Sequence, residues 1–446
     1  MKAIYFLIIM NMFSGMGYSI LAPLFPSLGN KYSLNEDLIG WILSTYAISN
    51  CVITPFIPSL CRYFGRIKLL YISTFCEATC TILYGILQYI SSYKFLLISV
   101  FIIRIIHGIS SAFIATLVYS ITCSLANEQE IEKAIGYLEI GLSMGTSSGP
   151  IFASVFFRIG GYSLPFIVLG LILYISVYLT KILEKENIDS EEVKEDPPFF
   201  RLLTNIDILT IFCSFIVGMI GFTFFDPCLT YHLKNNYGID ISNSSLFFIF
   251  PVFSYFIMIQ FLNFFSNKLG QYCMISLGLF IMSLGSYSTF PVPPIPKYIF
   301  SVIIGLILLG SGGPPIFIQG LLVLTKAVKE NKIDEKTSND ISSAMNNLSV
   351  SIGDFLGPII GGYLSAKYGF KYCCLLISLL IFLYFIIFTF YFFQYIKNNI
   401  NSDFLSNKNN NISQKLSFEN NSKNLCKNNI NIEMNMNNKL YSSLNE

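Results

Sequence analysis

Long apolar stretches alternate with short polar segments along the chain as far as residue 395. Each of twelve stretches is long enough to cross a bilayer as a helix, which takes about 20 residues. The pattern therefore predicts an all-α membrane protein with twelve transmembrane helices. The predicted spans are residues 3–25, 38–60, 69–90, 95–119, 134–157, 163–182, 206–230, 244–265, 272–290, 298–325, 339–365 and 370–395.

Two polar segments interrupt this pattern. Residues 183–205 are rich in charge, contain Pro197-Pro198 and separate six apolar stretches from six. Residues 397–446 are rich in Asn, Ser and Lys, and such a composition cannot bury enough apolar surface to fold. We therefore predict four parts: an N-terminal six-helix half (1–182), a cytosolic linker (183–205), a C-terminal six-helix half (206–396) and a disordered tail (397–446).

Small residues recur at helical spacing in the fifth stretch, which contains GLSMGTSSGPIFAS. Gly141, Gly145 and Gly149 lie four residues apart, so they share one face of a helix, and Pro150 follows them. In lipid such a face lets two helices approach backbone to backbone. A proline at this depth bends its helix, and neighbouring helices can satisfy the freed carbonyl. We expect these residues to control how the fifth helix packs and bends.

The eleventh stretch contains a near copy of this pattern, GDFLGPIIGG, with Gly353, Gly357 and Pro358 in matching positions. Other features repeat at a similar offset. They are Pro23 with Pro227, the loop at Gly65 with that at Gly270, and Gly108 with Gly310. Two same-direction repeats joined by a linker are typical of secondary transporters, whose substrate site lies between the halves near mid-membrane.

Composition agrees with a membrane protein and excludes an ordinary soluble domain. Of the 446 residues 53% are hydrophobic and 12% are charged, with a mean hydropathy of +0.61. A soluble domain would carry about 25% charged residues. The net charge of +2 gives no reason to expect a nucleic-acid partner. The 11 cysteines lack metal-site spacing, and we expect neither a metal nor another cofactor.

Basic residues indicate the orientation of the chain. Most of the 28 lysines and arginines fall in the N-terminal segment, the central linker, the tail and the loops on their side of the membrane. The positive-inside rule then places both termini in the cytosol. A glycosylation sequon at Asn243–Ser245 falls on the opposite side, as this orientation requires.

Three stretches resemble motifs of the major facilitator superfamily. PSLCRYFGRIK (58–68) is similar to its signature loop G-x-x-x-D-R-x-G-R-[KR]: Gly65 and Arg66 match, whereas Arg62 replaces the acid. RIIHGISSA (104–112) resembles R-x-x-Q-G, with His107 in place of Gln and Gly108 matching. GLSMGTSSGPIFAS resembles the fifth-span motif G-x-x-x-G-P-x-x-G-G of antiporters. The resemblance implies two six-helix halves that expose a central site alternately to either side.

Within that superfamily, FFDPCLTYHL (224–233) and GDFLGPIIGG most resemble the vesicular amine branch, which includes a polyamine transporter. The resemblance implies that Asp226 is the acid of the seventh span. Ser14 and Asn347 stand where vesicular monoamine transporters have aspartates, so it favours a polyamine-like or general organic-cation carrier.

Few ionisable side chains lie within the predicted spans, and each is a candidate because a charge in lipid is costly. Arg104 and Glu77 fall near mid-depth, and a histidine such as His107 titrates in a range suited to proton coupling. The alternative for each residue is a structural role, in which it holds helices together. The candidates for substrate binding or proton coupling are Arg104, Asp226, Glu77, Asp354, His107 and Glu139.

These features predict a monomeric secondary transporter of a vesicle, endomembrane or plasma membrane, with protons, a small molecule and lipid as partners. The leading hypothesis is proton-coupled antiport of an amine, polyamine or drug-like cation. One alternative is a facilitator or symporter of a neutral or anionic solute anchored by Arg104. Another is a transport-inactive receptor or scaffold that docks partners through its linker and tail. No paired carboxylates or nucleophile–base sets indicate an enzyme.

Overall fold

The structure is a computed structural model that describes residues 2–21, 24, 36–127, 130–180, 183, 198–226, 228–239, 245–289 and 299–394. Most of the predicted linker, the predicted tail, Pro23, Pro227 and Asn243 lie outside these residues. Contacts divide the chain into two compact units, Met1–Phe388 and Thr389–Glu446. The boundary between the predicted six-helix halves remains a prediction.

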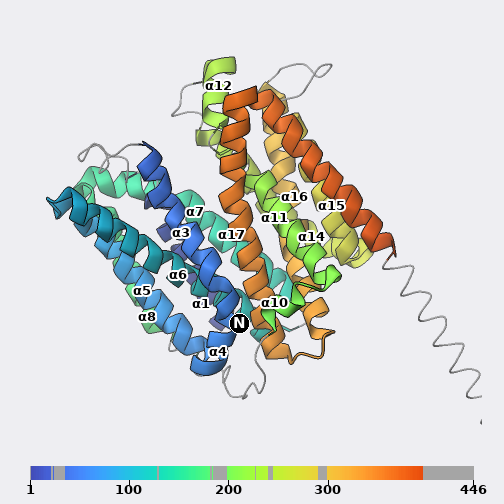
Figure 1. The fold of residues 1–446 in the computed structure, drawn as a ribbon, viewed down its shortest axis with the longest axis horizontal. Helices are drawn as coiled ribbons and strands as arrows, with labels where there is room; N and C mark the ends of the chain where they lie inside the picture. Colours follow the sequence, from blue (N-terminus) through green and yellow to red (C-terminus); the bar gives the residue numbers. More distant parts are fainter. Residues whose placement is uncertain are drawn as a thin grey trace, which may run out of the picture. The chain divides into compact units, whose positions relative to one another are not determined.

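All regular elements of the described residues are helices (Figure 1), as the apolar pattern predicts. The first half of the chain holds α1 (Lys2–Ser19), α3 (Glu36–Ile53), α4 (Ile57–Phe64), α5 (Arg66–Ile86), α6 (Tyr93–Leu125), α7 (Ile131–Gly160) and α8 (Ser163–Leu179). Short 3-10 turns, η1 (Thr54–Phe56) and η2 (Leu87–Tyr89), extend α3 and α5.

The second half repeats this order. It holds α10 (Phe199–Leu202), α11 (Ile206–Thr223), α12 (Leu229–Tyr237), η3 (Ser245–Phe248), α14 (Ile249–Leu269), α15 (Gln271–Ser288), α16 (Ile299–Lys329) and α17 (Glu335–Tyr368). A further helix covers Phe370–Gln394. The structure corrects the seventh predicted span, 206–230, because α11 ends at Thr223 and a turn at 224–226 separates it from α12.

Seven described helices are long and apolar enough to cross a membrane: Arg66–Tyr89, α6, α7, α11, α14, α16 and Phe370–Gln394. Two shorter apolar helices cover Ala3–Ser19 and Ser163–Leu179. Many large apolar side chains point outward from these helices, among them Phe390 at 66% exposed. A surface of this kind suits a lipid solvent, because lipid removes the penalty for exposing apolar groups.

The glycine face of α7 packs directly on the backbone of α1. A methyl group on Gly145 would lie 1.9 Å from the carbonyl oxygen of Met12, and one on Gly141 would lie 2.9 Å from that of Ile8. Gly149 approaches Ser19 in the same way, at 2.0 Å from its Oγ. Only residues without a side chain allow this spacing, so the glycines set the distance between the two helices. Pro150 follows them inside α7.

The same contact recurs between α17 and α11. Methyl groups on Gly353 and Gly357 would lie 2.8 Å from the carbonyl oxygen of Ile216 and 2.1 Å from Oγ1 of Thr223. Pro358 lies inside α17, as Pro150 does inside α7. The repeated sequence pattern therefore produces the same helix pairing twice.

Two further glycine pairs follow the repeat. A methyl group on Gly108 of α6 would lie 2.4 Å from the carbonyl oxygen of Tyr46 in α3, and one on Gly310 of α16 would lie 2.0 Å from that of Pro251 in α14. Gly65 and Gly270 both have positive φ, 81° and 82°, and each ends one helix and begins the next. Positive φ is strained for residues with a side chain, which explains why glycine stands at both sharp turns.

Candidate functional site

Glu77 of α5 and His107 of α6 form the centre of a buried polar cluster. Both side chains are 0% exposed, and Oε1 of Glu77 lies 3.7 Å from Nε2 of His107. Ser14 of α1 donates a hydrogen bond of 2.7 Å to the same Oε1. On the other side of the imidazole, the Tyr84 hydroxyl lies 3.2 Å from Nδ1. Three helices thus hold an acid and a histidine together without an aqueous surface around them.

Arg104 lies one helical turn before His107 and is 2% exposed. It donates hydrogen bonds to backbone carbonyls of α3, from Nη2 to Leu43 at 3.0 Å and from Nε to Ile42 at 3.3 Å. Its guanidinium also lies over the Tyr46 ring, 4.9 Å from the centroid. Neutral groups therefore hold a full positive charge beside the Glu77–His107 pair, a geometry in which cation–π attraction is strongest.

Tyrosine rings connect this cluster to the second half of the chain. The Tyr46 ring lies 5.1 Å from that of His107 and 5.1 Å from that of Tyr18, measured between centroids. The hydroxyl of Tyr18 donates a hydrogen bond of 3.2 Å to Oδ2 of Asp354 in α17. Because α1 and α17 belong to different halves, this bond spans the place where a central substrate site is expected.

The two second-half acids lie in different surroundings. Asp354 is half-buried in α17, one turn before Gly357. Asp226 is exposed in the turn after α11, where its backbone N–H donates to the carbonyl of Thr223. The two carboxylates interact electrostatically. The structure thus brings Arg104, Glu77 and His107 together. Asp354 is connected to this cluster through Tyr18 and Tyr46, whereas Asp226 lies in the turn that follows α11.

Glu139 lies apart from this cluster and joins the halves. It accepts a hydrogen bond of 2.7 Å from Tyr119 of α6 and one of 3.2 Å from Tyr255 of α14. Gly136, one helical turn before Glu139 on α7, packs against Ile259 of α14. Glu132, a further turn before it, accepts a hydrogen bond of 3.0 Å from Ser266 of α14. These contacts make a seam between α7 and α14.

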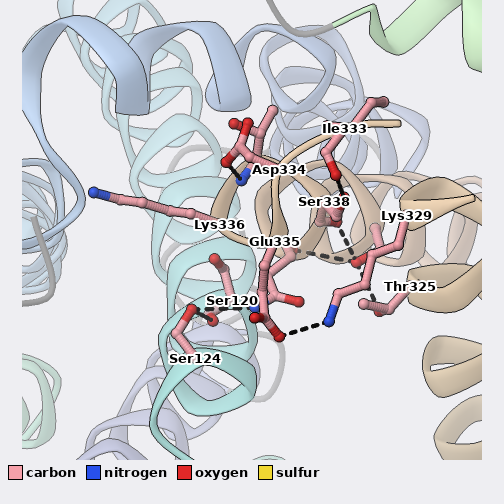
Figure 2. A network of polar contacts seen from close by, with 12 residues as sticks. Ser120, Ser124, Thr325, Lys329, Ile333, Asp334, Glu335, Lys336 and Ser338 are labelled. Atoms are coloured by element: carbon pink, nitrogen blue, oxygen red, sulfur yellow. Dashed lines mark hydrogen bonds and ion pairs between the residues drawn. The ribbon is translucent and has the colours of Figure 1, made fainter. Parts of the chain in front are cut away.

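A second seam joins α17 to the first half. Arg66 at the start of α5 is 1% exposed, and its Nε lies 2.8 Å from Oδ1 of Asp340. Arg66 also donates 2.9 Å to Ser124, and Ser120 donates to Asp340. Figure 2 shows Ser120 and Ser124 of α6 beside the first turn of α17. At that turn Asp334 caps the helix by accepting from the Thr337 N–H.

Farther along this second seam, amide and hydroxyl groups replace the charges. Nδ2 of Asn347 donates to Oδ1 of Asn50 at 3.2 Å, and the Ser351 hydroxyl donates to the same oxygen at 3.2 Å. Asn347, which stands where the amine branch has an acid, thus holds α17 against α3. Ser14 has the other role, because its partner is the candidate acid Glu77.

Sequence reasoning missed Asp340 and Tyr46. Asp340 lies at the start of a predicted span, near the membrane surface, where an acidic residue is common and does not by itself indicate a site. The signal was the missing signature-loop acid at position 62, which leaves Arg66 in need of a carboxylate from elsewhere. Tyr46 is one of 27 tyrosines, and nothing in the sequence separates it from tyrosines that face lipid.

Comparison with known proteins identifies the family of the chain. The family model described as Major Facilitator Superfamily matches residues 7–335 and 211–423, which together cover most of the chain. The chain belongs to the major facilitator superfamily. It is therefore a multi-pass membrane transporter and not an enzyme, as the sequence motifs predict.

Several members of this superfamily are similar to the chain, two of those named here along most of their length. The MFS-type transporter SLC18B1 of Mus musculus is 25% identical over 80% of this chain and 79% of that protein. Multidrug resistance protein 2 of Bacillus subtilis is 22% identical over 81% of this chain and 89% of that protein. The human synaptic vesicular amine transporter is 25% identical over 57% of this chain and 49% of its own length. The predicted likeness to the vesicular amine branch is confirmed.

The fold also matches a solved structure. A bacterial homologue of the iron transporter ferroportin in an outward-facing state superimposes with a TM-score of 0.71 over 87% of this chain and 99% of that chain. The sequence identity is 15%, so the likeness concerns the fold alone. The predicted all-α fold of this superfamily is confirmed.

Proposed function

We propose that this chain is a proton-coupled antiporter that exchanges protons for an organic cation by alternating access. The observation that carries the proposal is the hydrogen bond from Tyr18 to Asp354, which joins the two halves beside the Tyr46 ring. A carboxylate with tyrosine faces around it is suited to a positively charged amine, because the charge pairs with the acid and the alkyl groups contact the rings.

Arg104 supplies the competition that exchange requires. Its fixed charge lies over the Tyr46 ring, and the same ring contacts the rings of His107 and Tyr18. A cation at Asp354 and a proton on the Glu77–His107 pair would both add positive charge around this guanidinium. Like charges in a low-dielectric interior repel strongly, so each disfavours the other. Asp226, on the side assigned as outer, would attract the cation as it enters.

The two seams would govern access. Arg66 with Asp340 and Glu139 with Tyr255 join the halves near the ends where positive charge predicts the cytosol. A transporter closed at that end is open to the outside, and the similar ferroportin homologue is described as outward-facing. Opening to the cytosol would break both seams while α7 and α17 rock with their glycine-packed partners.

The names of similar proteins support the substrate class. A synaptic vesicular amine transporter and a multidrug resistance protein are among them. Amines and many drugs share a protonated nitrogen next to apolar groups, which matches an acid among tyrosines. We place the protein as a monomer in a vesicle, endomembrane or plasma membrane, with both termini in the cytosol.

The test is uptake of labelled spermidine, spermine, serotonin and a neutral sugar into proteoliposomes with an acidic interior. Gradient-driven amine uptake is expected, with a loss of at least about tenfold in Asp354→Asn, because the substitution removes the charge that pairs with the amine. Asp207→Asn is the matched control, since Asp207 lies in the first turn of α11 and has no place in the site. The antiport mechanism would be rejected if the rate of amine uptake is the same with and without the proton gradient and is unchanged in Asp354→Asn.

A second candidate function is facilitated or symport movement of an anionic or neutral solute. One observation favours it: Nη1 of Arg104 is buried and has no hydrogen-bond partner among the described residues. A carboxylate or phosphate could occupy that donor. This alternative would be established if the protein carries an anion, if the proton gradient does not change the anion flux, and if Arg104→Gln abolishes that flux.

A further inference from the structure

Two cysteines from separate helices donate to one backbone oxygen in the second half of the chain. Cys228, directly before α12, donates from Sγ to the carbonyl oxygen of Gly361 in α17 at 3.4 Å. Cys373, in the first turn of the last helix, donates to the same oxygen at 3.6 Å. The two sulfur atoms are therefore no farther apart than these two distances added together, and the thiols interact electrostatically. Both cysteines are free thiols.

The elements that carry these cysteines lie side by side. Cys228 and Cys373 share their acceptor at one level of the contact. One helical turn farther along α12, the ring of His232 stacks on that of Phe370, with centroids 4.5 Å apart. The residue numbers of the partners rise on one helix and fall on the other, as they do between antiparallel helices. This register places the two thiols opposite each other, so their proximity follows from how the helices pack.

A single buried cysteine usually packs as a small apolar residue, whereas two thiols that meet from different helices can also be joined. A disulfide forms where the two Cβ atoms come within about 3.5–4.5 Å. We infer that Cys228 and Cys373 form a redox-active pair, and that its oxidation to a disulfide fixes α12 to the last helix. Asp226 is exposed two residues before Cys228, so the disulfide also restrains the turn that carries this acid. Any effect of that restraint on cation entry rests on the proposed function.

The proposed orientation places this pair on the side away from the cytosol, because α11 begins next to the cytosolic linker and ends before Cys228. Disulfides form and persist in such oxidising compartments.

Oxidation proceeds by exchange with a small-molecule disulfide such as glutathione disulfide. Cys228 is the attacking residue, because it is 7% exposed and Cys373 is 0% exposed. Its thiolate attacks one sulfur of glutathione disulfide, which breaks that S–S bond and releases one glutathione. The Cys373 thiolate then displaces the second glutathione from Cys228. Two protons and two electrons thus pass from the pair to glutathione disulfide, which becomes two thiols.

Purified, full-length protein equilibrated with glutathione disulfide tests the inference. Mass mapping after proteolysis should recover the segment with Cys228 linked to the segment with Cys373, and dithiothreitol should release them. In the oxidised protein, the amides of α12 should exchange with deuterium at least about tenfold more slowly than in the reduced protein, because a disulfide restricts local opening. Cys373→Ser should abolish both the link and the slower exchange, and serine, which is close to cysteine in size, keeps the packing.

The chain offers two matched controls. Cys374 is the residue next to Cys373, but its sulfur accepts a hydrogen bond of 3.4 Å from Thr289 at the end of α15, so Cys374→Ser should leave the link in place. Cys76 and Cys80 are one turn apart on α5. The Cβ atoms of residues at this spacing are about 5–6 Å apart, beyond the reach of a disulfide, so this pair should stay reduced.

The inference would be overturned by any of three results. They are thiols that both stay reduced in the folded protein, a link that maps to Cys374, and equal exchange of α12 in the oxidised and reduced forms. None of these measurements uses an amine or a proton gradient. A protein that forms the link but carries no amine would therefore count against the proposed function alone.

Discussion

Arg66 and Asp340 form an ion pair in which both side chains are nearly removed from solvent, at 1% and 6% exposure, and which joins α5 to α17 at 2.8 Å. The signature loop of this superfamily carries an acid at position 62, where this chain has Arg62. The acid is instead supplied by the other half of the chain. The pair therefore ties the halves through a base from α5 and an acid from α17.

Removing one partner of this pair should destabilise the closed seam. Asp340→Asn leaves the guanidinium of Arg66 buried with fewer charge partners, and breaking a buried pair in this way costs about 3–5 kcal/mol. The protein should shift toward the state in which the seam between α6 and α17 is open. The shift can be measured as an increase in the distance between spin labels placed on either side of this seam.

The exposed pair Lys329–Glu335 is the control for that experiment. Its atoms lie 2.6 Å apart, but its side chains are 39% and 74% exposed (Figure 2). Surface pairs contribute about 0–1 kcal/mol, so Glu335→Gln should leave the spin-label distances unchanged. Equal shifts in the two variants would show that burial is not what makes the Arg66 pair important.

Two tyrosines that donate to Glu139 predict different outcomes for the same substitution. Tyr119→Phe removes a hydrogen bond inside the first half, whereas Tyr255→Phe removes one between the halves. Each should lower the free energy of unfolding by about 1–2 kcal/mol. Only Tyr255→Phe should also increase labelling of a cysteine placed on α7 in the seam, and equal labelling would argue against a gating role for Glu139.

Alanine at Gly145 or at Gly353 should destabilise the protein in both cases, because the two glycines hold equivalent positions in the repeat. The methyl of Gly145→Ala would meet the carbonyl oxygen of Met12 at 1.9 Å, and that of Gly353→Ala would meet Met219 Cβ at 2.6 Å. Overpacking of this kind costs about 1–3 kcal/mol, with the larger loss expected at Gly145 because backbone gives less than a side chain. Thermal unfolding would measure both losses.

Gly218 serves as the comparison for that series. Its methyl would lie 3.2 Å from a side-chain carbon of Ile316, which can move. Gly218→Ala should therefore change the melting temperature less than either of the other two substitutions. A melting temperature of Gly145→Ala equal to that of the wild type would show that α1 and α7 separate more easily than their spacing implies.

His232 of α12 should make this helix sensitive to acid. The side chain is 6% exposed and stacks on Phe370, with centroids 4.5 Å apart. Burial lowers the pKa of His232 from 6.5 to about 4. The unfolded state then binds more protons than the folded state between these values, so stability falls as pH drops through this window and is complete above it.

Hydrogen exchange of α12 would measure that effect. Its local opening free energy should fall by at most about 3 kcal/mol across the window, the equivalent of the pKa difference. His232→Gln removes the titration and should flatten the dependence. An opening free energy in the wild type that does not change with pH would mean that α12 releases His232 without unfolding.

The fold could be predicted from sequence because its determinants are local. Apolar length predicts the helices, and glycine spacing predicts a close helix contact at Gly145 and at Gly353, which the structure shows to be with α1 and α11. The seventh span was wrong at its end, because the turn at 224–226 interrupts a stretch that hydropathy alone treats as continuous. The relative placement of ionisable groups was the harder problem.

For the site, the sequence supplies residue types but not partners. His107 lies one turn after Arg104, so their proximity follows from helix geometry. The Glu77–His107 pair and the Tyr18–Asp354 bond join residues from different helices, and the Asp340 partner of Arg66 lies in the other half of the chain. Contacts of this kind depend on tertiary packing, which no single-sequence period encodes.

The glycine contacts between α1 and α7 also limit how the protein can move. With the backbone of Met12 against Gly145, any sliding of one helix along the other would drive a side chain into a carbonyl. Helices α1 and α7 must therefore move together as one rigid body, as must α11 and α17. A covalent tether between α1 and α7 should leave transport turnover unchanged, whereas the same tether between α7 and α14 should stop it. The relative movement of the helices during transport therefore occurs at the polar seams and not at the glycine-packed contacts.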